Sequence, residues 1–342
     1  MQSNKQNIPY SVLDLATVIE GKTPADSFKN SLDLAQHAEQ LGYRRFWLAE
    51  HHNMVSVASS ATAVLIGYIA AGTKTIRVGS GGIMLPNHAP LIVAEQFGTL
   101  ESIYPGRIDL GLGRAPGTDQ TTASAIRGAN MNAAFNFPQD VQTLQTLFSA
   151  ENKNGKVRAI PGEGLDIPIW ILGSSPDSAM LAAVMGLPYA FASHFAPAYF
   201  MQAIRLYRQN FKPSKHLAQP YVMACVNVIA AGSDAEANKL ATSVMQLFKG
   251  IVSGQRKLLQ PPVDSMDNIW TVQEEAAARQ MLTYSFIGSA EKIKTELQQF
   301  TESTGINEIM ATTHVYEHSA RINSYRIFSE VMKRVNAISQ VS

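Results

Sequence analysis

Polar, histidine and glycine residues recur in this sequence directly after short apolar runs that have the composition of β-strands. They are Asp14, Glu50-His51-His52, Ser80-Gly81-Gly82, Gly113-Arg114, Gly173-Ser174-Ser175, Ser193-His194 and His314. In a barrel of parallel strands such strand ends meet at one face, where enzymes of that architecture carry their sites. Four of the eight histidines fall in this set, which random placement does not explain. The pattern indicates a site whose groups exchange protons near neutral pH.

The segment Gly173-Ser174-Ser175-Pro176-Asp177-Ser178 has the features of an anion site at a helix N-terminus. Backbone N–H groups and hydroxyls at such a terminus bind phosphate well. Ser-Pro before a helix is also a capping signal, so these residues alone fit a helix cap equally well. Arg114 favours the phosphate interpretation, because a guanidinium at a strand end can bind phosphate with a fork of donors. The alternative for Arg114 is simple solvation at the rim.

Glu50-His51-His52 does not have the spacing of a metal site. Adjacent side chains on an extended segment point in opposite directions, so the two histidines are not expected to share an ion, and we predict no metal. One of them can face the barrel mouth as a proton donor or acceptor, and a purely structural histidine pair is the alternative. Ser80-Gly81-Gly82 lets backbone approach a flat ligand because no Cβ intervenes; the alternative is an ordinary turn.

The elements that would position these residues alternate between strand and helix along the whole chain. Eight strands are predicted, at Ile8–Leu15, Arg45–Ala49, Ile76–Gly79, Arg107–Leu112, Ile169–Leu172, Tyr189–Ala192, Tyr221–Ala230 and Glu308–Thr313. Helices are predicted from Pro24 to Gly42 and at Ala58–Ala71, Leu91–Ile103, Pro138–Phe148, Asp177–Met185, Ala198–Phe211 and Ser319–Val335. Eight such strands predict a closed (β/α)8 TIM barrel, since open doubly wound sheets usually stop near six.

Two segments interrupt the alternation and are predicted to be insertions in one domain that spans residues 1–342. Residues 149–166 are polar and contain glycine, whereas residues 233–279 combine helical patterns with an extended loop around Gln260-Pro261-Pro262. The polar stretch from Arg114 to Asn136 is predicted to be a loop. We expect the loop over residues 115–136 and the second insertion to shape a substrate pocket.

The composition excludes several classes of function. The net charge is +1, from 28 basic and 27 acidic residues. Such a balance produces no strong positive potential that would attract nucleic acid or anionic lipid. No apolar run reaches the roughly 20 residues that span a bilayer, and Met1–Ile8 lacks the apolar region of a signal peptide, so a cytoplasmic location is expected. Cys225, the one cysteine, lies in an apolar strand and is predicted to be an inert core residue.

The stretch Val57–Ala71 carries no charge on any face. A barrel helix needs one apolar face to cover its strand, so the other face requires a second cover. We predict a homodimer that packs through helices 58–71 and 91–103. Coverage by one of the chain's own insertions is the alternative.

Several motifs together resemble the bacterial luciferase-like monooxygenase family. They are Phe46-Trp47-Leu48-Ala49-Glu50-His51-His52, Ser80-Gly81-Gly82-Ile83-Met84-Leu85-Pro86, the run from Pro105 to Arg114, Leu172-Gly173-Ser174-Ser175 and Gly186-Leu187-Pro188-Tyr189. The similarity keeps motif order over nearly the whole chain, which makes it more specific than any single motif. The sequence is most similar to uncharacterised members. Light-emitting members carry a cysteine where Gly113 stands, which puts luminescence in doubt.

The resemblance implies a (β/α)8 barrel that uses FMN, as reduced FMNH2 from a separate flavin reductase, together with O2 and a small organic substrate. By this resemblance Arg114, Ser175 and Ser178 hold the FMN phosphate, and His51 is the catalytic histidine. Gly81-Gly82 falls where the family often has a non-proline cis peptide under the flavin ring. The remaining expected cofactor contacts are Glu50, Ser80, Gly173, Ser174, Ser193 and His194.

Two other functions remain open at this point. Related barrels include deazaflavin-dependent hydride transferases, which the sequence separates imperfectly from monooxygenases. A non-catalytic FMN-binding protein is a further alternative. His51 beside an intact Arg114 and Ser175 site favours an enzyme over a storage protein.

Overall fold

The computed structural model describes residues 7–128, 130 and 132–341 and shows one sheet in which every strand pairing is parallel. The sheet closes because β6 pairs with β7 and β1 pairs with β9. Its barrel strands are β1 (Tyr10–Asp14), β2 (Arg45–Leu48), β3 (Arg77–Met84), β4 (Ile108–Gly113), β5 (Ile169–Gly173), β6 (Tyr189–Phe191), β7 (Val222–Ala230) and β9 (Glu308–Thr312). The predicted eight-stranded barrel is confirmed.

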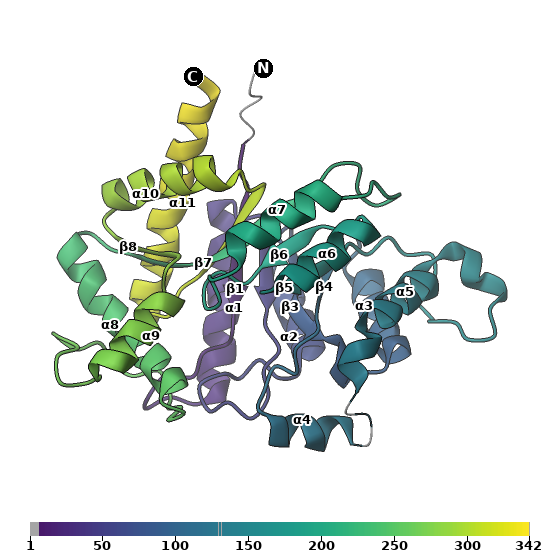
Figure 1. Ribbon diagram of the computed structural model, residues 1–342, viewed down its shortest axis with the longest axis horizontal. Helices are drawn as coiled ribbons and strands as arrows, with labels where there is room; N and C mark the ends of the chain where they lie inside the picture. The colour runs from purple at the N-terminus through teal and green to yellow at the C-terminus, as the bar shows by residue number, and fades with distance from the viewer. Residues whose placement is uncertain (1–6, 129, 131, 342) are drawn as a thin grey trace.

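Helices surround this barrel, as Figure 1 shows. They include α1 (Pro24–Leu41), α2 (Thr62–Ala71), α3 (Pro90–Ile103), α5 (Phe137–Phe148), α6 (Pro176–Met185), α7 (Phe200–Asn210), α10 (Ala290–Thr304) and α11 (His318–Val341). The α1 helix illustrates the local signals: Thr23 and Asp26 form a capping box, and Gly42 ends the helix at a φ of 86°. The start of β1 and the end of α11 lie at one end of the molecule, and α4 (Gln120–Arg127) lies at the opposite end (Figure 1).

Side chains inside the barrel form layers, because alternate residues of each strand point inward. The middle layer is apolar and forms a cluster separate from the residues that face the helices: Leu13, Trp47, Ala49, Trp170, Ala190, Met223, Cys225 and Met310. Cys225 is buried in this layer, as expected, and burial raises the pKa of its thiol.

A buried ionic network forms the layer at the N-terminal end of the strands. The guanidinium of Arg45 donates to Asp109 at 2.7 Å and to Glu308 at 3.0 Å. Trp47 Nε1 and Arg77 also donate to Asp109, and the Tyr221 hydroxyl donates to Glu308. Because this network fills the N-terminal end of the barrel, a ligand can approach the interior at the C-terminal end.

The structure corrects the predicted elements in three places. A ninth strand, β8 (Ser285–Gly288), pairs with the last four residues of β7, and α10 follows it. The stretch after Arg114 contains α4, an eight-residue helix that Asp119 caps by accepting from Thr122 N–H, and is therefore more than a loop. Within that stretch, residues 129 and 131 lie outside the described part.

The third correction concerns Ser80-Gly81-Gly82, which lie inside β3 and not after it. The pairing of β3 with β4 shifts register between Ser80 and Ile83. The Ser80 hydroxyl donates to Gly111 O at 2.8 Å and accepts from Gly111 N–H at 2.9 Å, which bridges the two strands at the shift. The Gly81-Gly82 peptide bond is cis, as expected.

Both predicted insertions pack against the barrel's own elements. Gly162 of the first insertion lies against Gly98 of α3, where a Cβ on Gly98 would be 2.2 Å from Gly162 Cα. The second insertion contains α8 (Asp234–Val252) and α9 (Val272–Met281). Its buried residues Ala241, Val244, Phe248 and Ala278 share a cluster with Ile229 of β7 and with Val315.

Candidate functional site

Glu50 lies at the C-terminal end of β2, and its side chain is buried. Its carboxylate accepts hydrogen bonds from His52 Nε2 at 2.8 Å, His88 Nε2 at 2.9 Å and Met84 N–H at 3.1 Å. Burial alone would raise the pKa of Glu50, but these hydrogen bonds lower it to about 2. The carboxylate predicted to contact a cofactor is therefore engaged by the protein itself, and it joins the end of β2 to the end of β3.

His51 points away from its two neighbours, as the alternation of an extended segment requires. Its Nδ1 lies 3.2 Å from Gly117 O. Since a carbonyl oxygen only accepts, this contact assigns the ring proton to Nδ1 and leaves the lone pair on Nε2. Burial lowers the pKa of His51, and the hydrogen bond to Gly117 and the Glu50 charge offset part of this effect. At neutral pH the ring is uncharged and can accept a proton at Nε2.

The loop after β4 contacts residues 50–52 and thereby helps to orient His51. Gly117 has a φ of 68°, and a Cβ there would be 2.7 Å from Glu50 O, so the position requires glycine. Gly117 O accepts from His52 N–H at 3.1 Å, and the Thr118 hydroxyl donates to His52 O at 2.8 Å. Sequence reasoning missed Gly117 and His88. Gly117 follows a proline and is therefore a turn signal in the sequence, but the sequence does not show that its carbonyl oxygen contacts His51 and His52.

The expected phosphate site lies between the end of β4 and the start of α6. Arg114 is half-exposed, and its guanidinium lies 3.7 Å from the exposed carboxylate of Asp177. The Ser175 hydroxyl caps α6. The Ser178 hydroxyl donates to Ser175 O at 2.8 Å and lies 3.0 Å from the Tyr189 hydroxyl. The structure thus brings Arg114 and Ser175 to one edge, whereas Ser178 already has protein partners.

Gly173 is required at this edge by packing. A Cβ on Gly173 would lie 2.0 Å from Ser178 Oγ, so a side chain would displace the serine that turns toward Ser175. At Gly81 a Cβ would lie 2.7 Å from Leu13 Cδ1, and at Gly82 it would lie 2.7 Å from Gly111 O. Packing inside the barrel therefore accounts for both β3 glycines, independently of any flat ligand. Ser174, between Gly173 and the cap, is half-buried.

A polar wall, which we define as His194, Asn227 and His314, lies on the side of the mouth formed by β6, β7 and β9. All three side chains are at least nine-tenths buried. Within the described part of the chain, His194 Nδ1, Asn227 Oδ1 and His314 Nδ1 have no hydrogen-bond partner. Such atoms are costly to bury unpaired, so they mark a place where a ligand or water would bind.

Both rings of the polar wall are uncharged at neutral pH. Burial, followed by the charges of His314 and His51, lowers the pKa of His194 to about 3. Burial and the Arg321 charge lower the pKa of His314 to about 4. Asn227 was missed in the sequence, although it is the one polar residue in the run from Val222 to Ala230.

Two other residues near the mouth, Ser193 and Asp14, make contacts that stabilise the fold. The Ser193 hydroxyl, expected at the cofactor, donates to Cys225 O at 2.6 Å and is fully buried. Asp14 accepts from Arg321 Nη2 at 2.7 Å, a buried ion pair between β1 and α11. Among the described residues, no group of three or more His, Cys, Asp or Glu side chains could hold a metal ion.

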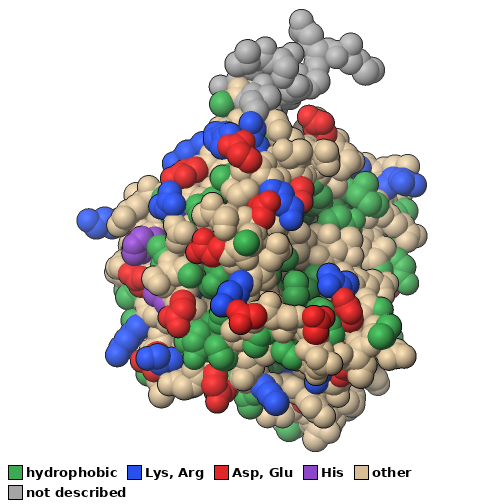
Figure 2. Space-filling view, turned by 90° about the vertical axis from the view of Figure 1, so that its left-hand side faces the viewer, with side chains coloured by type: hydrophobic (Ala, Val, Ile, Leu, Met, Phe, Trp, Pro, Cys, Tyr) green, Lys and Arg blue, Asp and Glu red, His purple; other side chains and the backbone are tan. Residues whose placement is uncertain are grey.

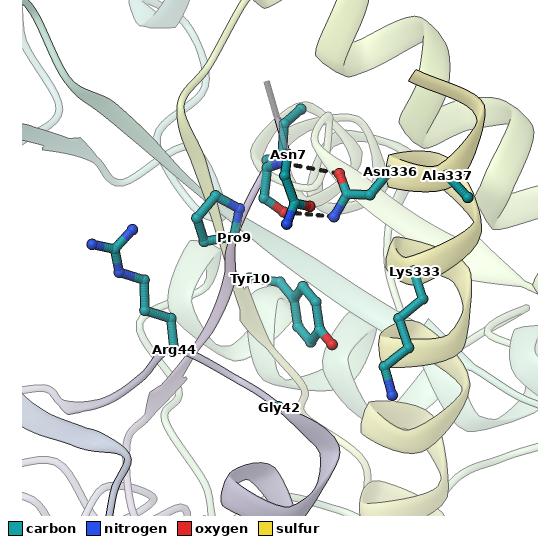
Figure 3. Close-up of a pocket in the computed structure, with 9 residues that line it drawn as sticks. Asn7, Pro9, Tyr10, Gly42, Arg44, Lys333, Asn336 and Ala337 are labelled. Atoms are coloured by element: carbon teal, nitrogen blue, oxygen red, sulfur yellow. Dashed lines mark hydrogen bonds between the residues drawn. The ribbon is translucent and has the colours of Figure 1, made fainter. Parts of the chain in front are cut away.

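A cavity of about 410 Å³ lies at the opposite, N-terminal end of the barrel. It is lined by Asn7, Ile8, Pro9, Tyr10, Gly42, Arg44, Lys333, Asn336 and Ala337 (Figure 3). The Asn336 amide is occupied there, since it accepts from Ile8 N–H and donates to Ile8 O. Because sites in this architecture lie at the C-terminal ends of the strands, we assign the functional site to the mouth and not to this cavity.

One face of the molecule carries charged side chains of both signs. Figure 2 shows the face around α8 and α10, where acidic and basic side chains alternate without a continuous patch of one sign. In the described residues, no helix combines the length and the apolar character that a membrane crossing requires.

Comparison with known sequences gives the same family over most of the chain. The family described as luciferase-like monooxygenase matches residues 9–308. The chain is 54% identical over 332 residues to the uncharacterized protein YvbT of Bacillus subtilis, covering 97% of this chain and 98% of that one. It is 50% identical over 330 residues to a luciferase-like monooxygenase of Escherichia coli, with coverages of 96% and 98%. A B. subtilis N-acetyl-S-alkylcysteine monooxygenase is 31% identical over 335 residues, with coverages of 95% and 98%.

Solved structures give the same architecture. The apo structure of MsnO8 superposes with a TM-score of 0.85 at 32% identity, covering 95% of this chain and 98% of that one. The oxygenating constituent of 3,6-diketocamphane monooxygenase from Pseudomonas putida, in complex with FMN, has a TM-score of 0.72 at 16% identity, with coverages of 96% and 98%. An F420-dependent secondary alcohol dehydrogenase has a TM-score of 0.70, also at 16% identity, with coverages of 96% and 99%. At 16% identity these last two similarities concern the fold alone.

Glu50→Gln is expected to destabilise the protein in a pH-dependent way. The pKa of Glu50 is lowered from 4.5 to about 2, so its ionised form stabilises the fold by roughly 3 kcal/mol at pH 7. This contribution is fully present above pH 4.5 and is lost as the pH falls toward 2. The free energies of unfolding of parent and variant, measured in urea, should therefore differ most at pH 7 and progressively less between pH 4.5 and 3.

The control is Glu302→Gln, at an exposed position of α10, which should leave the free energy of unfolding unchanged at every pH. If the free energies of unfolding of parent and Glu50→Gln differed by the same amount at every pH in this range, the charge of the carboxylate would not be what stabilises the segments around the mouth.

Proposed function

Because the chain belongs to the luciferase-like monooxygenase family, we propose that it is a flavin-dependent oxidoreductase, and specifically an FMNH2-dependent monooxygenase that acts on a small organic substrate with O2. The observation that carries this proposal is the placement of His51. An uncharged imidazole with its lone pair on Nε2 stands at the barrel mouth, held by Gly117. Such a group can take or return one proton beside a bound ligand.

The residues present fit a flavin phosphate at the edge of the mouth. Arg114 has only a long contact with an exposed carboxylate, so its guanidinium is free to turn toward an anion. The N-terminus of α6, a ten-residue helix, adds its positive end and the Ser175 hydroxyl. Ser174 lies beside them. The unpaired atoms of the polar wall provide hydrogen-bonding groups on the other side of the mouth.

The protein's own residues would divide the work between binding and proton transfer. Reduced FMN, when bound, would supply the electrons that activate O2. Arg114 and Ser175 bind the phosphate and so fix the position of the ring. His51 holds or moves the proton at Nε2, and general acid–base help of this kind is typically worth about 10²–10⁴-fold. The part of the stretch after β4 that contacts the His51 segment, Gly117 and Thr118, would help to cover the mouth and exclude water.

A deazaflavin-dependent hydride transferase is the second candidate, because the F420-dependent dehydrogenase shares the fold. The two candidates differ in whether O2 is consumed. A flavin reductase that supplies FMNH2 is part of the leading proposal, because the chain's family resemblance implies a two-component system.

We propose a homodimer as the assembly, through the outer faces of α2 and α3. Val64 and Tyr68, one turn apart on α2, are 72% and 41% exposed, and Ile92 and Ile103 on α3 are 48% and 59% exposed. Clustered exposure of large apolar side chains is typical of an interaction surface.

The dimer predicts a mass of two chains by light scattering at micromolar concentration. Val64→Arg should shift the mass toward one chain, because a charge would be buried in the interface without a partner. The matched control is Val272→Arg on α9, where the valine is 79% exposed. A parent mass of one chain would contradict the dimer.

Arg114→Ala is expected to weaken FMN binding by on the order of 1.5–3 kcal/mol, the range for hydrogen bonds to a charged group. Quenching of FMN fluorescence measures the affinity. Arg334→Ala, which removes a surface ion pair with Glu291 on α10, is the control and should bind FMN as the parent does. Unchanged affinity in Arg114→Ala would place the phosphate elsewhere on the rim.

His51→Ala is expected to bind FMN with parental affinity but to lose productive oxygenation. Without the imidazole, the O2 consumed with FMNH2 should appear as hydrogen peroxide instead of oxygenated product. Peroxide released per O2 consumed measures this uncoupling, and His37→Ala on α1 serves as the control. If His51→Ala oxygenated substrate at the parental rate, the proton would have to pass through another group.

A further inference from the structure

Asn227 lies on the row of β7 side chains that faces the barrel interior. Cys225, two residues earlier, belongs to the apolar layer inside the barrel, and alternate residues of a strand share a face. Asn227 is therefore the next inward residue toward the C-terminal end of β7. His51 follows Ala49 of the same layer in the same alternation. Asn227 and His51 thus both lie on the mouth side of the apolar layer.

The contacts of Asn227 fix the orientation of its side-chain amide. Its Nδ2 donates to His194 O at 2.6 Å and to Ser285 Oγ at 3.2 Å. A carbonyl oxygen only accepts, so the NH2 group must lie on the side of His194 O and Oδ1 must point elsewhere. Both N–H bonds are used by the protein, and the side chain can therefore offer a ligand only its oxygen.

The Oδ1 atom of Asn227 is an acceptor that lacks a donor. The residue is 1% exposed, and no described residue donates to Oδ1. A buried acceptor in this condition is costly, and such atoms usually have a partner in the working protein. Because the amide cannot turn without losing the contact to His194 O, this atom selects a ligand group that carries a hydrogen.

The surroundings of Asn227 favour an uncharged donor. Thr312 lies opposite Asn227 in the register of β7 and β9, and the rings of His194 and His314 are uncharged at neutral pH. Among the described residues, no hydrogen bond or ion pair joins the polar wall to a carboxylate. A cationic donor would therefore be buried without a counter-charge, which costs more than burying a neutral N–H group.

The unpaired ring nitrogens of the polar wall complement a carbonyl oxygen. Nδ1 of a neutral imidazole can donate, and in His194 and His314 this atom has no partner among the described residues. His194 lies beside Asn227, whose Nδ2 donates to its carbonyl oxygen. An acceptor next to a donor matches a neutral ligand group with N–H and C=O side by side, which is the composition of a carboxamide.

We propose that Asn227 determines substrate specificity: the substrate is a small neutral amide whose N–H group donates to Asn227 Oδ1 at the polar wall. This assignment rests on the proposed function, since it places the amide at the same mouth as the flavin. A site built to hydrogen-bond a ligand group discriminates strongly against an analogue that lacks it. An ester of the same shape brings an oxygen atom to Asn227 Oδ1 in place of N–H and leaves the acceptor unpaired.

The test compares N-ethylacetamide with ethyl acetate, which has nearly the same shape and an oxygen atom in place of N–H. Protein saturated with FMN and labelled with ¹³C and ¹⁵N in asparagine is titrated with each compound, and the side-chain amide signal of Asn227, identified by its absence in Asn227→Leu, is followed by NMR. N-ethylacetamide is expected to shift this signal and to bind about tenfold more tightly than ethyl acetate, which leaves a buried acceptor unpaired.

In Asn227→Leu, which has a similar volume and no acceptor, the two compounds should bind equally. Thr312→Val is the matched control, because it removes the hydroxyl of the residue opposite Asn227 and should keep the preference for the amide. The ratio of the two affinities in the parent needs no variant and decides the preference by itself. Equal binding of the two compounds to the parent, binding of neither, or a preference that survives Asn227→Leu would overturn the proposal.

The flavin is the other source of an N–H donor, and FMN is therefore also added alone. A shift of the Asn227 signal with FMN that 3-methyl-FMN fails to produce would assign the donor to the flavin and overturn the assignment to the substrate. FMN affinity is measured separately by fluorescence quenching. If the parent failed to bind FMN, the proposed function would fail, whereas the same titration of flavin-free protein would still decide whether Asn227 selects an N–H donor.

Discussion

Glu50 ends β2 with a buried carboxylate on which donors from two other segments converge. His52 comes from the same strand end, and His88 and Met84 N–H come from the end of β3 and the turn that follows it. Because the backbone of residues 50–52 is held in this way, His51 is left to point to Gly117. The loop after β4 then packs on Glu50 O through Gly117. A carboxylate that accepts three hydrogen bonds from the protein thus sets the position of His51.

The two ends of the barrel interior differ in composition, and this difference places the site at the C-terminal end of the strands. Arg45, Asp109 and Glu308 fill one end with charges that satisfy each other, and an apolar layer around Trp47 and Met310 separates them from the mouth. Above that layer the inward residues are polar and incompletely paired. Stability and binding are therefore assigned to opposite ends of the same strands, as in other (β/α)8 barrels.

Much of the fold could be predicted, because eight strands with helical spacers leave few alternatives and capping signals such as Thr23-Pro24 are local. The rim residues His51, Arg114 and Ser175 were also visible as strand ends. The roles of Ser80, Ser178 and Ser193 could not be predicted, since each hydroxyl is bonded to a residue that the fold alone brings near. His88 and Asn227 were missed for the same reason: their significance depends on neighbours that are distant in sequence.

The central claim is the proposal that the mouth built around His51 directs O2 into a small organic substrate when reduced FMN is bound. The most direct measurement mixes anaerobic protein and FMNH2 with ¹⁸O2 and a panel of small organic compounds, followed by mass spectrometry of the products. One ¹⁸O atom in a product, formed by the parent and absent with His51→Ala, is the predicted result. Turnover that leaves every product unlabelled, with no O2 consumed, would contradict the claim and favour hydride transfer.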